Sequence, residues 1–195
     1  MATYTLNPNE DHAPDAGTWT LSTGTDIWDL INQASGYVIN NTVEQDFRVG
    51  FTTQALGAGE TIDSIQCCIK AHTGNTRSET AVVRVDVEKG NNADYFTDNH
   101  TVTENGGAAA TYCSAAETVN PATSAAWEQN AIDTIRMDVE ITSFSGGSPD
   151  AVLHQAYILV ETTIVIPPVP TYTSDDQVIL SGGTLELKNG NTTIG

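Results

Sequence analysis

The sequence predicts an all-β protein folded as an antiparallel sandwich or barrel. Residues 81–88 alternate, with Val83, Val85 and Val87 on one face of the expected strand and charged residues on the other, a pattern typical of a strand with one buried side. Residues 135–141 repeat it. Turn-forming segments rich in glycine and asparagine separate such runs at short intervals, which favours antiparallel strands over βαβ units. These turns cover residues 57–60, 89–94, 105–108 and 145–150.

Other alternating or apolar runs predict further strands, and one segment near the N-terminus predicts a helix. The strands cover residues 47–51, 65–71 and 152–166. In residues 25–33, Thr25 can cap a short helix with one apolar face. That face consists of Ile27, Leu30 and Ile31.

A second helical turn is expected near the segment NPATSAAW, which ends at Trp127. Within residues 123–131, Thr123 or Ser124 can serve as the N-cap. A large aromatic residue just inside a capped turn more often points into the core than into solvent. We therefore expect Trp127 to be structural.

The composition changes at residue 166, and we place a domain boundary there, between residues 1–166 and residues 167–195. Three prolines, Pro167, Pro168 and Pro170, impose an extended linker that cannot join the interior of a sheet. The tail beyond it alternates like strands but is too short to form its own core. Its apolar residues are therefore expected to mediate oligomerisation, most simply as a trimer, or attachment to a particle. These residues are Val178, Leu180, Leu185, Leu187 and Ile194.

The charge of the chain restricts its partners. With 7 basic and 25 acidic residues among 195, the net charge is −18. A field of this sign repels nucleic acid and anionic lipid, so we expect neither as a partner. No segment has the pattern of a secretion signal or the roughly 18 apolar residues that a membrane helix requires.

The three cysteines, Cys67, Cys68 and Cys113, are expected to be free thiols in a reducing compartment. Neighbouring residues on a strand point to opposite faces, so Cys67 and Cys68 should not bridge each other. The alternation of residues 65–71 predicts that Cys67 is buried and that Cys68 lies on the opposite face.

No motif indicates catalysis or a bound cofactor. The four histidines, His12, His72, His100 and His154, lie far apart in sequence, and no two of them form an i, i+4 pair. The HExxH, GxSxG, P-loop and GxGxxG patterns do not occur. We expect no enzyme, no catalytic residue, no metal and no cofactor. Residues 86–98 collect oxygen ligands suited to calcium, but their spacing is not that of an EF-hand, so a solvated acidic turn is the preferred interpretation.

Several segments occur in an order that resembles a known module. They are YTLNPNEDHAPDAGTWTLSTGTDIWDLINQ, VGFTTQALGAGETIDSIQCCIKAH, NPATSAAWEQNAIDTIRMDVEI and VLHQAYILVETT. Over residues 3–163 they resemble a jelly-roll sandwich module of tailed-phage virion proteins and some bacterial surface proteins. The resemblance implies a jelly-roll fold in which NPATSAAW covers one end. The chain departs from the pattern at Ser124, where glycine is usual, and at Thr162 and Thr163, where an aromatic residue often closes the strand.

The resemblance implies a non-enzymatic virion structural protein exposed on the particle surface. A capsid decoration protein or head fibre is preferred to a tail component, because the chain is short. The expected partners are sister subunits and the major capsid protein or a tail protein of the same virion, assembled in the host cytoplasm.

Two alternatives remain open at this stage. The chain can be a tail fibre, adhesin or carbohydrate-binding module that recognises host glycans, with Tyr95 and Phe96 as the best candidate contacts among its aromatic residues. It can also be the subunit of a self-assembling surface filament, in which the C-terminal strands add to a neighbour's sheet.

Overall fold

The chain forms two compact units, Met1–Val165 and Ile166–Gly195. The structure is a computed structural model that describes residues 1–12, 19–23, 26–32, 36–74, 79–90, 93–103, 108–146 and 150–166, and the backbone of 176–181, 184–189 and 192–194. The expected three-proline linker lies outside these residues. In the described part, no helix has the length and apolar character needed to span a membrane.

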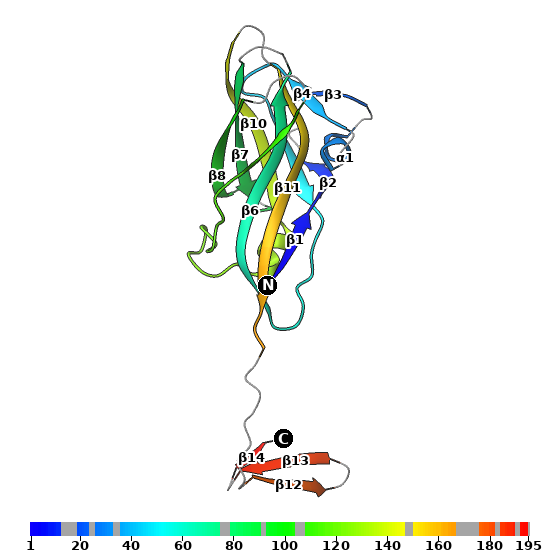
Figure 1. Cartoon of the computed structure of the whole chain (residues 1–195), viewed down its shortest axis with the longest axis vertical. Coiled ribbons are helices and arrows are strands. Elements are labelled where there is room, and N and C mark those ends of the chain that lie inside the picture. Colours follow the sequence, from blue (N-terminus) through cyan, green and yellow to red (C-terminus); the bar gives the residue numbers. More distant parts are fainter. Residues whose placement is uncertain are drawn as a thin grey trace. The chain divides into compact units, whose positions relative to one another are not determined.

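The first unit is an antiparallel sandwich, and its larger sheet has six strands (Figure 1). The order is β3-β4-β11-β6-β9, and β1 also pairs with β11. The strands are β1 (Ala2–Leu6), β3 (Thr20–Leu21), β4 (Val38–Asn40), β6 (Glu60–Thr73), β9 (Ala110–Cys113) and β11 (Ala151–Ile164). The two longest strands, β6 and β11, run side by side and form the centre of the sheet.

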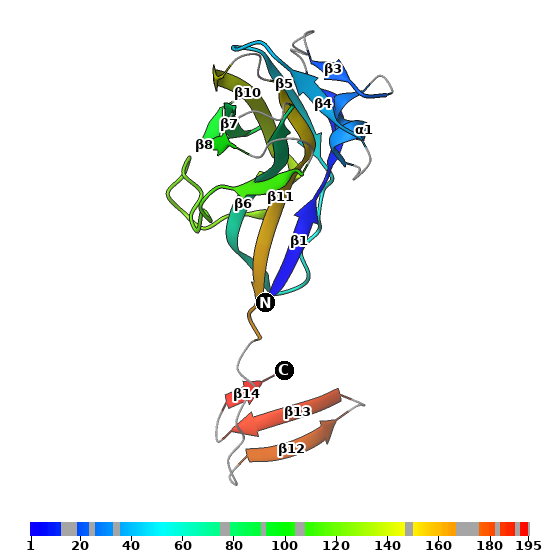
Figure 2. The ribbon, with the colours of Figure 1, turned by 45° about the horizontal axis from the view of Figure 1, so that its top comes forward.

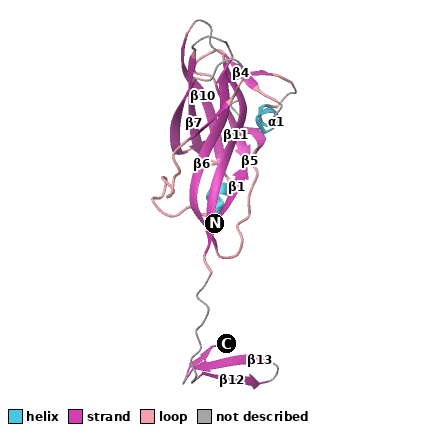
Figure 3. Cartoon of the chain, viewed as in Figure 1, coloured by secondary structure: helices cyan, strands magenta, loops and turns pink. Residues whose placement is uncertain are grey.

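The second sheet has five strands in the order β2-β5-β10-β7-β8, and Figure 2 labels β5, β10, β7 and β8 of this sheet. They are β2 (Pro8–His12), β5 (Asp46–Phe51), β7 (Thr80–Glu88), β8 (Asp94–Val102) and β10 (Arg136–Ser145). Among the described residues, helix occurs in two short segments, α1 (Ile27–Asn32) and α2 (Gln129–Asp133), and Figure 3 shows the sandwich built mainly of strands. The predicted all-β, antiparallel jelly-roll sandwich with two helical turns and a β-rich C-terminal extension is confirmed.

The inner faces of both sheets supply one apolar core. In β7, Val83, Val85 and Val87 are fully buried, as the alternation predicts. The inward positions of β10 and β6 behave in the same way, and Phe47 of β5 is the largest of the fully buried side chains. Because directly paired residues of antiparallel strands share a face, matched alternation in neighbouring strands assembles a continuous apolar layer.

Helix α1 occurs where the sequence predicts it, with Ile27, Leu30 and Ile31 buried. Its N-terminus is capped from β2. The carboxylate of Asp11 accepts hydrogen bonds from the backbone N–H groups of Ile27 (3.0 Å) and Trp28 (2.8 Å). This satisfies donors that have no partner within a helix. The predicted cap, Thr25, lies outside the described residues.

The prediction of three free cysteines is wrong, because Cys68 and Cys113 form a disulfide. These residues lie directly opposite each other on β6 and β9, at a Cα–Cα distance of 4.1 Å. Sequence spacing does not reveal such a cross-strand pair. Cys67 is buried on the inner face, as predicted, and burial raises the pKa of its thiol to about 11, so it is unreactive.

A polar cluster lies at the C-terminal end of β11. Thr162 is fully buried, and its hydroxyl donates to the carboxylate of Glu60. The same carboxylate accepts a hydrogen bond from the hydroxyl of Tyr4 at 3.0 Å. The hydrogen bond from Thr162 is the largest cause of a lowered pKa of Glu60, and the one from Tyr4 also lowers this pKa. The threonine therefore links β11 to the start of β6.

The second unit contains a separate three-stranded antiparallel sheet. Its strands are β12 (Asp176–Ser181), β13 (Thr184–Asn189) and β14 (Thr192–Ile194). Adjacent strands pair antiparallel, and residues 182–183 and 190–191, where the sequence predicts hairpin turns, lie outside the described residues.

Candidate functional site

A tight turn precedes α2 and forms one side of the candidate site. The backbone N–H of Asn120 donates to the carbonyl of Ala125, and that of Ser124 donates to the carbonyl of Asn120, both at 2.8 Å. The side-chain carbonyl of Asn120 also accepts from the N–H of Ala122 at 3.0 Å. Ser124 has φ = 56°, a left-handed conformation that glycine adopts without strain. Glycine, the residue expected at this position from the sequence resemblance, would therefore fit the turn.

The prediction of a helix beginning at Thr123 or Ser124 is therefore wrong, since α2 begins only at Gln129. The residues of NPATSAAW bond to one another across the turn instead. Trp127 is nonetheless buried and structural, as predicted. Its indole N–H donates to the carbonyl of Glu117 at 2.8 Å, and its ring packs edge-on against Tyr95, with centroids 5.1 Å apart.

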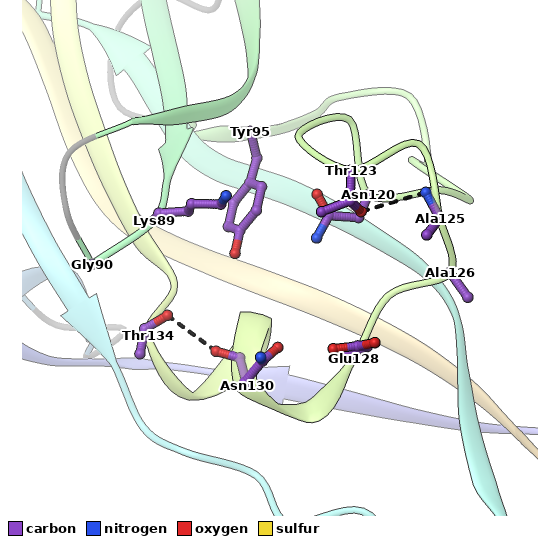
Figure 4. Close-up of a pocket in the computed structure, with 10 residues that line it drawn as sticks. All are labelled: Lys89, Gly90, Tyr95, Asn120, Thr123, Ala125, Ala126, Glu128, Asn130 and Thr134. Carbon is purple, nitrogen blue, oxygen red and sulfur yellow. Dashed lines mark hydrogen bonds between the residues drawn. The ribbon is translucent and has the colours of Figure 1, made fainter.

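A hollow of about 510 Å³ lies between this turn, α2 and the connection from β7 to β8 (Figure 4). We call it the turn pocket. It is lined by Lys89, Gly90, Tyr95, Asn120, Thr123, Ala125, Ala126, Glu128, Asn130 and Thr134. Figure 4 shows the ring of Tyr95 between Lys89 and the Asn120 turn, with the phenol oxygen directed toward α2. The lining thus combines the largely buried ring of Tyr95 with hydroxyl, amide, carboxylate and ammonium groups.

The electrostatics of the turn pocket favour hydrogen bonding over proton transfer. The ammonium of Lys89 lies 5.5 Å from the centroid of the Tyr95 ring, a cation–π arrangement. Burial raises the pKa of Tyr95, so its phenol stays protonated and can donate. Glu128 and Asn130 are exposed on the opposite side. Together these groups can donate to and accept from a polyhydroxylated ligand.

A second hollow of about 340 Å³ adjoins the turn pocket and shares Gly90 and Thr134 with it. Its other lining residues come from β2, β5 and the segment from the end of α2 to the start of β10. They are Glu10, His12, Gly50, Phe51, Asp133, Ile135 and Arg136. The two hollows provide a polar depression longer than either alone.

The predicted aromatic pair does not form a single platform. Tyr95 lines the turn pocket, but it is only 6% exposed, with Lys89 and Trp127 against its ring. Phe96 is half-buried and packs against the core. Tyr95 thus offers an edge and a hydroxyl instead of an open stacking face.

The residues predicted to mediate assembly occupy one face of the C-terminal sheet. The register pairs Val178 with Leu187, Leu180 with Leu185, and Leu187 with Ile194. Directly paired positions share a face, and alternate positions along a strand return to that face. The positions of the opposite face hold Gln177, Ile179, Glu186, Lys188 and Thr193. The backbone register therefore gathers the five apolar positions on one face, which also holds Asp176, Asn189 and Thr192 at one end of the strands, and leaves a mainly polar opposite face.

The sequence did not reveal a charged network on the outer face of the five-stranded sheet. Arg48 lies 2.7 Å from the carboxylate of Glu88 and 2.9 Å from that of Asp138. All three side chains are at least nine-tenths buried. Desolvation, together with the nearby charge of Asp46, raises the pKa of Asp138 to about 7 despite Arg48. Alternation placed these residues on the outer face, but only the fold brings them together.

In the acidic segment considered for calcium, Asp86 is engaged by protein side chains. The carboxylate of Asp86 accepts hydrogen bonds from Arg84 and Thr97. Asn91 and Asn92 lie outside the described residues. Across the described ranges, no group of three or more His, Cys, Asp or Glu residues is arranged to hold a metal ion.

No protein-family model matches the chain, and no curated protein matches it. Among solved structures, it is similar to a carbohydrate-binding module described as "CBM4 structure and function", with 8% identity, a TM-score of 0.35, and coverage of 82% of this chain and 86% of that one.

Two longer proteins also contain a similar domain. The enzymatically active domain of tailspike protein 4 of bacteriophage CBA120 has 13% identity and a TM-score of 0.40, with coverage of 82% of this chain and 19% of that one. The arabinose-bound α-L-arabinofuranosidase MgGH51 has 9% identity and a TM-score of 0.36, with coverage of 80% and 25%. These similarities are too weak to transfer any function to this chain.

Proposed function

We propose that this chain is a non-enzymatic glycan-binding protein displayed on the surface of a phage particle. The turn pocket carries the proposal, because it places amide, hydroxyl and charged side chains around a hollow of about 510 Å³ beside Tyr95. Sugars are recognised by a few convergent polar groups and an apolar wall. The resemblance of residues 3–163 to virion modules supports the placement on a particle.

The shape and charge of the site indicate the class of glycan. The adjoining hollow extends the depression, which suits an oligosaccharide better than a single sugar. A net charge of −18 disfavours polyanionic glycans over the whole surface. The proposed ligand is therefore a neutral oligosaccharide.

Asn130→Ala tests the proposal directly. Asn130 is exposed within α2, where alanine is a better helix former, so the variant should remain folded. Loss of one hydrogen bond of about 1 kcal/mol should weaken binding roughly fivefold in isothermal titration with a neutral oligosaccharide selected on a glycan array. The control is Asn99→Ala, the same change at an exposed position of β8 outside the pocket.

Equal affinity in the two variants would reject the turn pocket as the binding site. A wild-type protein that binds no glycan on the array but binds emptied capsids would reject glycan recognition altogether. That result would favour the second candidate function.

The second candidate is attachment or assembly as a capsid decoration protein or head fibre. The observation that favours it is the apolar face of the β12–β14 sheet, formed by the positions of Val178, Leu180, Leu185, Leu187 and Ile194. A sheet of 15 strand residues cannot remain stable in water with that face exposed. Three sister tails around one axis would cover it with closed symmetry.

Cutting the chain after Pro170 tests this candidate. The sandwich should remain folded, run as a monomer in light scattering, and lose attachment to emptied capsids. An oligomer that survives the truncation contradicts assembly through the tail. Open-ended fibres of the full chain would favour the filament alternative over a closed trimer.

A further inference from the structure

Two histidines that are 82 residues apart in sequence, His72 and His154, meet on the outer face of the six-stranded sheet. His72 lies opposite Val152 in the register of β6 and β11. The register then shifts between Leu153 and Gln155, so His154 is the extra residue of a β-bulge. Bulges redirect side chains and are common beside functional sites. Here the bulge brings the two imidazole rings to a centroid separation of 5.1 Å.

Backbone hydrogen bonds orient both rings in the same way. Nδ1 of His72 lies 2.8 Å from the carbonyl oxygen of Thr73, which can only accept, so Nδ1 carries the hydrogen. His154 donates to the backbone carbonyl of Gly36, and its Nε2 is buried without a hydrogen-bond partner. The donor is therefore Nδ1 of His154 as well. In the neutral rings, the lone pair is on Nε2 in both residues.

This arrangement is the one that metal-binding histidines use. Such a residue donates one ring N–H to a carbonyl or carboxylate and coordinates the metal through the other nitrogen. A metal bound at about 2.0–2.1 Å from two imidazole nitrogens, at a roughly tetrahedral angle, places the ring centroids about 5 Å apart. The observed separation of 5.1 Å agrees with that geometry.

The rings line a hollow of about 280 Å³, and Nε2 of His154 is itself buried beside it. Ile39 and Val152 contribute apolar lining, and Tyr37 and Asp150 contribute polar groups. Tyr37 is 39% exposed, and its ring centroid lies 5.7 Å from that of His154. Since the described residues contain no cluster of three or more metal-binding side chains, water must complete the coordination.

We propose that His72 and His154 form a two-imidazole site for a first-row transition-metal dication, such as Zn²⁺ or Cu²⁺, on the outer face of the six-stranded sheet. Imidazole nitrogen suits these ions, whereas Ca²⁺ and Mg²⁺ prefer oxygen ligands. The site is separate from the turn pocket and does not depend on glycan binding.

Metal titration of the full chain after chelator treatment tests the site. Zn²⁺ should bind with one-to-one stoichiometry in calorimetry and raise the melting temperature, while Ca²⁺ should do neither. His72→Gln and His154→Gln should each weaken Zn²⁺ binding at least tenfold. His12→Gln and His100→Gln are matched controls in other strands and should bind like the wild type.

Electron paramagnetic resonance of the Cu²⁺-loaded wild type tests the site without any substitution, so a folding defect of a variant cannot affect the result. The spectrum should show two equatorial nitrogen ligands. A spectrum that shows only one nitrogen ligand, or only oxygen ligands, would overturn the proposal. Undiminished Zn²⁺ binding in folded His154→Gln, or no binding by the wild type at millimolar Zn²⁺, would also overturn it.

Discussion

The outer face of the five-stranded sheet holds buried charges together, whereas the outer face of the six-stranded sheet holds a disulfide and a pair of imidazole rings. On the first, Arg48 links carboxylates of β7 and β10. On the second, Cys68 is joined to Cys113 across β6 and β9. The inner faces are both apolar and resemble each other. The difference shows that two sheets with one shared core can stabilise their outer faces by unrelated chemistry.

The largest effect is expected from Arg48→Ala on the charged face. The substitution leaves Glu88 and Asp138 buried without their cation, which should cost about 3–5 kcal/mol at neutral pH. Denaturant unfolding measures the loss. Arg84→Ala is the matched control. Because the Arg84 side chain is 41% exposed, its removal should lower the free energy of unfolding by about 1 kcal/mol or less. Equal losses for the two arginines would mean that burial does not distinguish the Arg48 network.

The disulfide face is tested by Cys113→Ala. Opening a cross-link with a sequence separation of 45 should cost about 2–4 kcal/mol. Thermal unfolding with and without reductant measures it. Reductant should destabilise the wild type by a similar amount and leave Cys113→Ala unchanged. A wild type that is insensitive to reductant under unfolding conditions would show that the bond adds nothing to stability.

The pH dependence of stability separates Asp138 from the other titrating groups. Its pKa is about 7 in the fold and 3.8 without perturbation, so the folded state binds the proton more tightly. The contribution of this protonation to the free energy of unfolding is fully present below pH 3.8 and is lost as pH rises through about 7. When the pH is lowered from 8 to 5, the free energy of unfolding of the wild type should therefore increase by about 2–3 kcal/mol relative to that of Asp138→Asn.

Comparing the two unfolding curves at each pH cancels groups that both proteins share. His100 is one of these, since burial lowers its pKa and gives the opposite slope. A constant difference between wild type and Asp138→Asn across this range would contradict a raised pKa of Asp138.

The smallest effect is expected from Ser124→Gly, in a turn that belongs to neither outer face. Ser124 has φ = 56°, which costs a residue with a side chain about 1 kcal/mol relative to glycine. The variant should be more stable by about that amount in denaturant titration. Ala122→Gly in the same turn serves as the control and should not stabilise. A destabilised Ser124→Gly would show that the serine side chain itself contributes to the turn.

The sequence by itself determined the inner faces, the short helix α1 and the separate C-terminal strands. Alternation in residues 81–88 and 135–141 indicates which side of each strand is apolar. That side becomes buried because removing apolar surface from water is favourable. Tyr95 was also singled out from sequence, although its ring turned out to be mostly buried. The turn at Ser124 was mistaken for a helix, because capping residues and turn residues are the same residue types.

Only the tertiary structure decided which residues meet on the outer faces. Cys68 bonds to Cys113, Arg48 contacts Glu88 and Asp138, and His72 contacts His154. The two residues of each contact are 40 or more residues apart in sequence. Alternation specifies the face of a residue but not its partner, which depends on strand order, register and bulges. The turn pocket is likewise a product of packing, because its lining comes from the β7–β8 connection, the Asn120 turn and α2. Local sequence therefore sets each strand's faces, and long-range register sets the chemistry between strands.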